Sequence, residues 1–351
     1  MIGIFCSLGY SADPPVGATR VVIIEAPGAV HLFQPSQQIV TAMINHALTN
    51  LTGQPDLVAA WRSLVSPTDV IGIKVYAAPG PLCGTRVATA AAVIEGLIES
   101  GLNPTNIIVW DKRYADLKAA GFTELAPRYG VQVKGAIETG FDEAAFYESP
   151  ILGALMWGDL EFGKHAEVLG RNSYVTKLLT KKVTKIVSIA PLLNNHLTGA
   201  AGHMYSLAMG SVDNTARFEV SADRLAIAVP EICALPELRD RLVLCITDAL
   251  ICQYEGAQRC LLHYSTVLNQ VWVARDPVAL DLLAVHEIAR QRRRAGAPTR
   301  ELDLALYQNA GLLELGVSDT NKLTLVRLSV PTSVAVPASH LSRESTTNNT
   351  R

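Results

Sequence analysis

Two histidines and two glycines follow an apolar run in "IVSIAPLLNNHLTGAAGHMYSLAMGS", residues 186–211. His196 comes directly after the run, and its imidazole is the candidate acid or base because imidazole titrates near neutral pH. Gly199 and Gly202 would let the backbone turn tightly and donate N–H groups to an anion. His203 is interpreted as structural or surface-exposed. The spacing of the histidines fits neither a zinc-binding helix nor a serine-hydrolase triad.

Polar side chains also follow three other apolar runs. Lys74 follows "VIGI", Asp111 follows "IIVW" and Asp248 follows "LVLCIT", just as Asn195 and His196 follow "IVSIAPLL". In an open α/β sheet, ligands bind at the carboxyl ends of the strands, so we expect these groups to meet at one edge. A lysine near two carboxylates would hold an anionic group while a carboxylate or an imidazole moves a proton.

Each of these side chains has a structural alternative. Lys74 could extend from an edge strand with its aliphatic stem on apolar surface. Asp111 and Asp248 could each accept backbone N–H groups in a turn or cap the following helix. The G-x-x-G spacing also occurs in ordinary tight turns. The sequence leaves both interpretations open.

Short runs rich in Val and Ile alternate with longer stretches of helical period, which indicates βα units on a largely parallel sheet. Most runs are continuously apolar, so helices should cover both faces. The sequence predicts an α/β fold with a mainly parallel sheet, as one domain or as two lobes around a cleft. The predicted strands are residues 20–26, 69–77, 106–112, 185–191, 241–249, 269–275 and 322–328.

Two helices carry recognisable end signals. Apolar residues recur at helical spacing through 87–98, with Thr85 as the predicted N-cap and Gly101 beyond the end. A second helix begins at "DPVALDLLAVHEIAR", where Asp276 would cap and Pro277 would fill the first helical position.

The α/β domain is predicted to span residues 20–330. Residues 137–170 break the βα pattern and are interpreted as an insertion that flanks or covers a site. Residues 331–351 are polar and rich in Ser and Thr, so we expect a disordered tail. Residues 1–19 resemble the end of an apolar export segment without its basic start. We therefore expect an exported, periplasmic protein, and the alternative is a cytoplasmic protein with a short disordered arm.

Composition excludes two classes of partner. The chain has 351 residues, 49% of them hydrophobic, and a net charge of -2, which supplies ample core and no basic stripe for nucleic acid. The densest basic run, "RQRRR" at 290–294, is expected at a helix end, where cations complement the dipole. No apolar run reaches the roughly 18 to 20 residues that span a bilayer, so no transmembrane segment is predicted.

The cysteines encode no local metal site. The sequence contains no C-x-x-C pair and no His spaced to complete a zinc site, so neither an iron–sulfur nor a structural zinc motif is predicted. A metal bound by distant residues stays open. Cys233, Cys245, Cys252 and Cys260 could form a disulfide in an exported protein or remain as buried free thiols.

The segments around these residues resemble, in order and spacing, the family known as domain of unknown function 362, over roughly residues 20–290. The resemblance is greatest to the exported branch, whose members often carry a twin-arginine signal. Other branches have ferredoxin-type cysteine clusters, which this chain lacks. The positions that match are Lys74, Thr85, Asp111, Asp248, Asp276 and Asp281.

The central segment of that family is in turn similar to the "H-x-x-A-G-x-x-G-G-x-K" stretch of nickel-pincer lactate racemases. There the His is catalytic or metal-binding, and the Lys tethers the cofactor. Here Asn195 stands at the His position and Tyr205 at the Lys position. A tyrosine cannot form that covalent link, so a tethered cofactor is not expected. His196 lies beside the His position, and Gly199 and Gly202 are in register with the glycines of that stretch. Tyr76 and Ser206 stand where the family known as domain of unknown function 362 usually has Asn.

These observations lead to three functional hypotheses. The first is an enzyme that transfers a proton to or from a small anionic molecule. Lys74 would hold the anion, His196 would be the acid or base, Asp111 and Asp248 would orient groups or bind a metal, and the turn at 199–202 would donate N–H groups. The second is a non-catalytic cofactor- or metal-binding protein that serves a redox partner. The third is a scaffold that has lost its chemistry, and the oligomeric state stays open.

Overall fold

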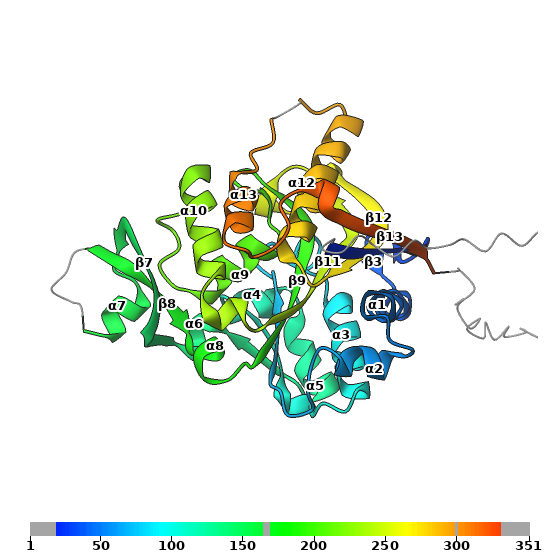
Figure 1. Cartoon of the computed structure of the whole chain (residues 1–351), viewed down its shortest axis with the longest axis horizontal. Helices are drawn as coiled ribbons and strands as arrows, with labels where there is room; N and C mark the ends of the chain where they lie inside the picture. Colours follow the sequence, from blue (N-terminus) through cyan, green and yellow to red (C-terminus); the bar gives the residue numbers. More distant parts are fainter. Residues whose placement is uncertain (1–18, 164–168, 299–300, 331–351) are drawn as a thin grey trace, which may run out of the picture.

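The computed structural model describes residues 19–163, 169–298 and 301–330 (Figure 1). The predicted tail and nearly all of the predicted N-terminal arm lie outside the described residues. The strands are β1 (Thr19–Glu25), β2 (Val30–His31), β3 (Gln34–Pro35), β4 (Ile71–Val75), β5 (Ile107–Asp111), β6 (Gln132–Gly135), β7 (Phe141–Ala154), β8 (Leu169–Thr176), β9 (Lys185–Asn195), β10 (Gly199–Ala200), β11 (Leu242–Gln253), β12 (Ser265–Ala274) and β13 (Leu323–Ser329). The helices are α1 (Gln37–Thr52), α2 (Leu57–Arg62), α3 (Val87–Glu99), α4 (Tyr114–Ala119), α5 (Leu125–Tyr129), α6 (Ala136–Thr139), α7 (Trp157–Glu161), α8 (Lys177–Lys181), α9 (His203–Ser211), α10 (Ala222–Cys233), α11 (Pro236–Arg239), α12 (Pro277–Arg294) and α13 (Ala305–Leu312).

One large sheet organises the described chain. Its strand order is β13-β1-β12-β11-β9-β4-β5-β6, with β10 paired to β9. The strands from β11 to β6 are parallel, whereas β12 runs antiparallel to both of its neighbours. The α/β fold with a mainly parallel sheet is therefore confirmed, and every predicted strand is present.

The period of two along the strands separates the two faces of the sheet. On β4, Ile71, Ile73 and Val75 pack in the core beneath α1 and α3, so Gly72 and Lys74 point to the opposite face. Helices α9, α10 and α12 cover that opposite face (Figure 1). The alternation thus directs Lys74 toward α9.

The two predicted helix starts had different outcomes. Asp276 caps α12 as predicted, because its Oδ1 accepts a hydrogen bond from Ala279 N at 2.8 Å, and the helix ends at Arg294. The prediction that Thr85 is the N-cap of the helix that follows it, α3, is wrong, since Arg86 is the N-cap of α3. The Thr85 hydroxyl instead donates to Ile189 O at 2.7 Å and accepts from Tyr76 N at 2.9 Å, so it joins two strand ends.

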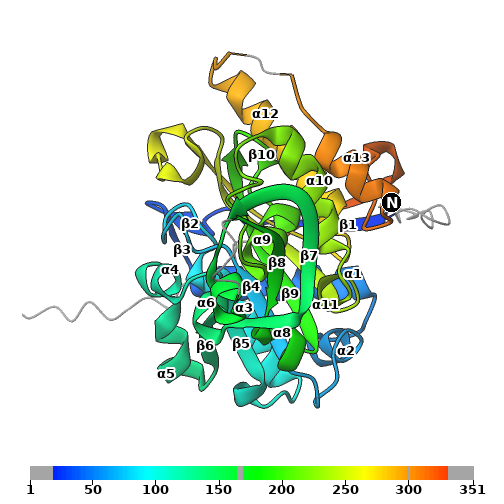
Figure 2. The same ribbon diagram turned by 90° about the vertical axis from the view of Figure 1, so that its left-hand side faces the viewer.

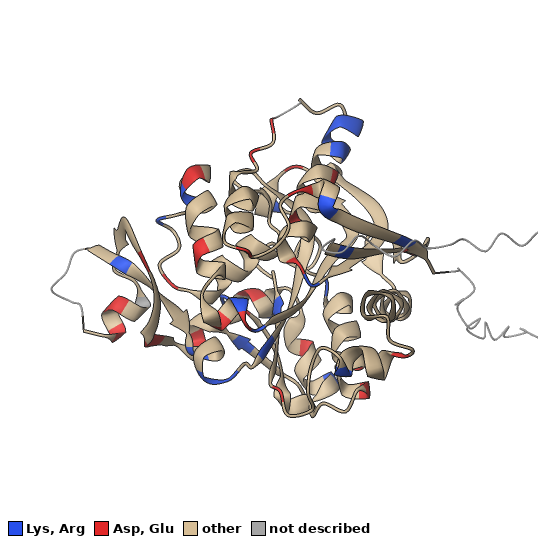
Figure 3. Ribbon diagram, in the orientation of Figure 1, with Lys and Arg blue, Asp and Glu red and all other residues tan. Residues whose placement is uncertain are grey.

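The interpreted insertion, residues 137–170, contains β7, which pairs antiparallel with β8 outside the main sheet, and β8 extends beyond the predicted end of the insertion to Thr176 (Figure 2). Charged residues of both signs are spread over the described elements, and the basic run 290–294 lies at the end of α12 (Figure 3). Within the described ranges, every helix is too short or too polar to cross a membrane.

The N-terminus of α9 is held by a buried carboxylate from α12. Asp281 accepts hydrogen bonds from His203 N at 2.6 Å and from Met204 N at 2.8 Å. Gly202 makes this approach sterically feasible, because a Cβ at that position would lie 2.1 Å from Asp281 Oδ1. The glycine therefore positions α9 by admitting a cap from another helix.

Replacing Asp281 with Ala should lower the free energy of unfolding by about 2–4 kcal/mol, because it leaves two N–H groups at a buried helix end without an acceptor. Urea unfolding measures this loss. Asp240→Ala removes an exposed carboxylate and is the control, with an expected change within about 0.5 kcal/mol. Equal effects of the two substitutions would refute a specific role for the Asp281 cap.

Candidate functional site

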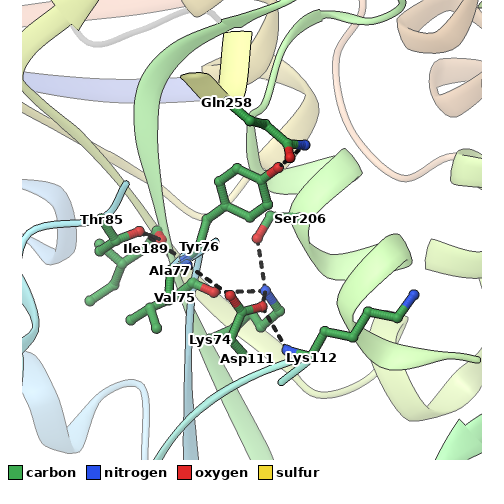
Figure 4. A network of polar contacts seen from close by, with 10 residues as sticks. All are labelled: Lys74, Val75, Tyr76, Ala77, Thr85, Asp111, Lys112, Ile189, Ser206 and Gln258. Carbon is green, nitrogen blue, oxygen red and sulfur yellow. Dashed lines mark hydrogen bonds and ion pairs between the residues drawn. The ribbon is translucent and has the colours of Figure 1, made fainter. Parts of the chain in front are cut away.

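Lys74 and Asp111 form a buried ion pair between the ends of β4 and β5 (Figure 4). The Lys74 ammonium donates to Val75 O at 2.7 Å, to Asp111 Oδ1 at 2.8 Å and to Ser206 Oγ on α9 at 2.9 Å. Gly210 lets α9 approach, since a Cβ there would lie 2.3 Å from Lys74 Cε. Two strands and a helix meet at one cation.

The hydrogen bonds of this pair are complete on both sides. Asp111 Oδ2 accepts from Ala77 N at 2.7 Å, and Oδ1 also accepts from Lys112 N at 2.8 Å. Burial lowers the pKa of Lys74, and the neighbouring Asp111 charge opposes that shift. An ammonium has three protons to donate, and all three already have acceptors. A direct contact from Lys74 to an anion would have to replace one of them.

A hollow of about 400 Å³ opens beside the pair, and we call it the Lys112 hollow. It lies where ligands bind in sheets of this class, at the carboxyl ends of β4 and β5. Met156 of the insertion lines one part of it. Its lining also includes charged, hydroxyl-bearing and amide side chains: Tyr76, Asp111, Lys112, Arg113, Asp116, Tyr205, Ser206, Thr215, Glu219 and Gln258.

Lys112 is a cation of this hollow whose hydrogen-bond partner is uncharged. Its Nζ donates to the hydroxyl of Thr215 at 2.6 Å, and no ion pair joins it to a carboxylate within the described ranges. Burial lowers the pKa of Lys112 to about 8, with Glu219 and Asp213 opposing the shift and Arg113 adding to it. Near neutral pH, a minor fraction of the Lys112 side chains therefore carries an uncharged amine.

Two tyrosines form the wall on the α9 side. The rings of Tyr76 and Tyr205 meet edge to face with centroids 6.2 Å apart. The Tyr76 hydroxyl accepts from Gln258 Nε2 at 2.6 Å, and the Tyr205 hydroxyl donates to Glu219 Oε2 at 3.3 Å. Burial raises the pKa of both phenols, so they stay neutral and act only as hydrogen-bond groups.

His196 lies on the other side of this wall. It is exposed directly after β9 and lines a second hollow of about 300 Å³, which shares Tyr205, Glu219 and Gln258 with the Lys112 hollow. The adjacent Asn195 uses its Oδ1 to accept from Leu197 N at 2.9 Å, which forms a local turn. His196 and Asn195 are therefore near the Lys74 pair but open into a different space.

Three N–H groups in and directly after the glycine turn bind acceptors inside the protein. The N–H groups of His203 and Met204, which follow Gly202, bind Asp281, and Ala201 N donates to Leu193 O at 2.9 Å. Gly199 has a positive φ of 78° and pairs with Asn195 across β9 and β10. Since these donors have acceptors, an anion at this turn would compete with existing bonds.

Asp248 lies on the opposite face of the sheet from Lys74. The predicted strand ends at residue 249, but β11 continues to Gln253, so Asp248 is inside the strand and not at its end. Its side chain accepts from Arg86 N and Arg86 Nη1, both at 2.9 Å, and from Thr89 Oγ1 at 3.0 Å. Asp248 thus binds the start of α3 and does not line the Lys112 hollow.

His203 is a buried cross-link between strands. Its ring nitrogens bind Ser188 Oγ at 2.8 Å and Thr247 Oγ1 at 3.1 Å. Burial lowers the pKa of His203 to about 3, so the ring is neutral in the folded protein. This geometry fits the structural alternative given for this residue.

The sequence did not identify Lys112, Glu219 and Gln258 as site residues. Lys112 directly follows Asp111 in "NIIVWDK". Its position after a parallel strand is the signal that could have placed it at the ligand-binding edge. Glu219 and Gln258 come from distant segments without a motif. Tyr76, Tyr205 and Ser206 differ from the residues usual in the families that the sequence resembles, which marks them as departures and not as site residues.

The described part of the chain contains no cluster of three or more His, Cys, Asp or Glu side chains arranged to hold a metal ion. Cys233, Cys245, Cys252 and Cys260 are free thiols there, and the first three are buried. These four cysteines therefore follow the free-thiol alternative in this structure.

Replacing Lys74 with Met should lower the free energy of unfolding by about 3 kcal/mol, because it leaves the Asp111 carboxylate buried without its countercharge. Urea unfolding of Lys74→Met, Asp111→Asn and the double variant measures the coupling between them. The double variant should lose less than the two single losses combined. Strict additivity would contradict a coupled pair.

His203 should make the protein less stable in acid. The unfolded chain binds a proton at the ordinary pKa near 6.5, whereas the folded ring binds one only near 3, so stability falls as pH drops below about 6.5. At pH 5 this contribution is about 2 kcal/mol relative to pH 8. His203→Gln lacks it, so its unfolding free energy should approach that of the wild type on acidification. A difference that stays constant with pH would contradict the buried neutral ring.

Comparison of the sequence with models of known protein families finds no match, and comparison with curated proteins also finds none. Among solved structures, the chain is similar to a structural-genomics crystal structure of a protein from Thermotoga maritima, with a TM-score of 0.41 and 12% sequence identity. The similarity covers 78% of this chain and 62% of that protein, so this chain spans less than two thirds of its length. Similarity at this level carries no functional argument.

Proposed function

We propose that the protein is an enzyme that binds a small anionic molecule in the Lys112 hollow and transfers a proton to or from it. The observation that carries this proposal is the position of Lys112, a partly buried amine with a neutral partner at a carboxyl-end hollow. Arg113, exposed and lining the same hollow, would add positive charge for an incoming anion. Lys112 and Arg113 would attract the anion, and the carboxylates of Asp116 and Glu219 line the same hollow.

The geometry favours Lys112 over Lys74 for direct contact with the anion. All three donors of Lys74 have acceptors, whereas Lys112 Nζ has one hydroxyl partner. In this proposal Lys74 and Asp111 are positioning residues, because Asp111 accepts from the backbone N–H of Lys112 and so fixes where that side chain begins. His196 would act only on a ligand that also reaches the second hollow.

Proton transfer has two candidate groups in this hollow. The unprotonated fraction of Lys112 is a base, since its pKa of about 8 lies close to physiological pH. Glu219 lines the same hollow, and its carboxylate is the second candidate acid or base. The neutral phenols of Tyr76 and Tyr205 would donate or accept hydrogen bonds without changing charge.

Two further expectations remain proposals. Membership of the family known as domain of unknown function 362 rests on the quoted segments, and export to the periplasm rests on residues 1–19. Neither one is needed for the assignment of Lys112.

Binding of small anions should depend on Lys112. Titration calorimetry with pyruvate, malonate and inorganic phosphate should detect at least one of them, and Lys112→Met should weaken that affinity about tenfold or more, since it removes the nearest cation. Lys118→Met removes an exposed lysine of α4 and is the matched control, with unchanged affinity. The proposal fails if the wild type binds none of the three, or if Lys112→Met binds as tightly as the wild type.

A further inference from the structure

The Lys112 hollow has features that distinguish it from a simple anion site. A lysine that only binds an anion does so as the charged ammonium, which a water-exposed position favours. Here the amine is directed to the Thr215 hydroxyl, which is itself buried, and the surrounding lining is rich in neutral hydroxyls. Such an environment suits an amine that must react as a nucleophile.

We infer that Lys112 forms a Schiff base with a small carboxylate that carries a ketone or aldehyde carbonyl, such as a 2-oxo acid. This inference rests on the proposed function, because the same hollow must first bind the anion. The hollow's volume of about 400 Å³ admits a molecule of that size. Arg113 at the rim would hold the carboxylate while the carbonyl carbon faces Lys112.

The reaction balances with groups that line the hollow. The neutral Lys112 amine attacks the carbonyl carbon, the new C–N bond forms, and the carbonyl oxygen takes up a proton to give a carbinolamine. The nitrogen loses one proton as the carbinolamine forms. An acid then gives the hydroxyl a second proton, the C–O bond breaks, and the oxygen leaves as water, so that a protonated imine with one N–H remains. Glu219 or Asp116 would carry the protons, and the Tyr76 and Tyr205 hydroxyls would bind the departing oxygen.

The imine gives a physical role to the proton transfer. A protonated C=N group next to a carboxylate withdraws electrons from the adjacent carbon, which makes its C–H bond more acidic. A carboxylate such as Glu219 could then remove that proton.

The charged groups that act on Lys112 are Glu219, Asp213 and Asp111, which favour the ammonium, and Arg113, which favours the free amine.

Borohydride trapping tests the inference. Full-length protein is incubated with pyruvate and sodium borohydride, which adds hydride to the C=N bond and makes the link permanent. Intact-mass analysis should show one adduct with the mass of pyruvic acid less one oxygen atom, and peptide mapping should place it on Lys112. Lactate carries the same carboxylate without the carbonyl and should give none.

Two variants complete the experiment. Lys112→Arg keeps a positive charge but has no amine that can form the imine, so the adduct should be lost, whereas Lys118→Arg should label like the wild type. Circular dichroism confirms that both variants are folded. Labelling at Lys112 should also rise with pH through about 8, as the free amine becomes abundant.

The possible failures are distinct. Pyruvate that binds by calorimetry but leaves no adduct overturns the Schiff base and leaves the proposed anion site intact. Adducts spread over many lysines, or retained at full yield in Lys112→Arg, overturn it as well. Absence of the adduct and of pyruvate binding, with malonate or phosphate still bound, overturns this inference alone, whereas absence of binding of all three anions overturns the proposed function with it.

Discussion

The buried contact between the Lys74 ammonium and the Asp111 carboxylate is the constraint on which this region depends. Two charges without water cost several kcal/mol each, and the cost is offset only where hydrogen bonds are complete. Lys74 has acceptors on β4, β5 and α9, and Asp111 accepts two backbone N–H groups besides. The pair therefore fixes where β4 and β5 end relative to α9, and with them the first atoms of Lys112.

Polar side chains on the two faces of the sheet bind different helices. On the α9 face, Asp281 of α12 caps the helix, and His203 joins it to β9 and β11. Gly202 and Gly210 allow the close approach of Asp281 and Lys74. On the α3 face, Asp248 and Thr85 join that helix to the strands. The polar residues of the sheet are thus mostly structural, and the reactive candidates come from the loops beyond it.

The strands and the mainly parallel character of the sheet followed from the sequence, because continuous runs of Val and Ile are typical of strands that are covered on both faces. The proximity of Lys74 and Asp111 followed as well, since adjacent parallel strands end at one edge. The position of Asp248 did not, because its face depends on register and on how far β11 extends past the polar residue. The hollow also required Thr215, Glu219 and Gln258, which only tertiary packing brings to Lys112.

The central claim is that Lys112 carries an amine whose pKa is well below that of an ordinary lysine. The direct measurement is a pH titration of the lysine side chains by NMR, with carbon-13-labelled lysine and with Lys112→Arg to assign the signal. The account predicts a midpoint near 8 for Lys112, against about 10.4 for solvent-exposed lysines. A Lys112 midpoint at the ordinary lysine value would contradict it.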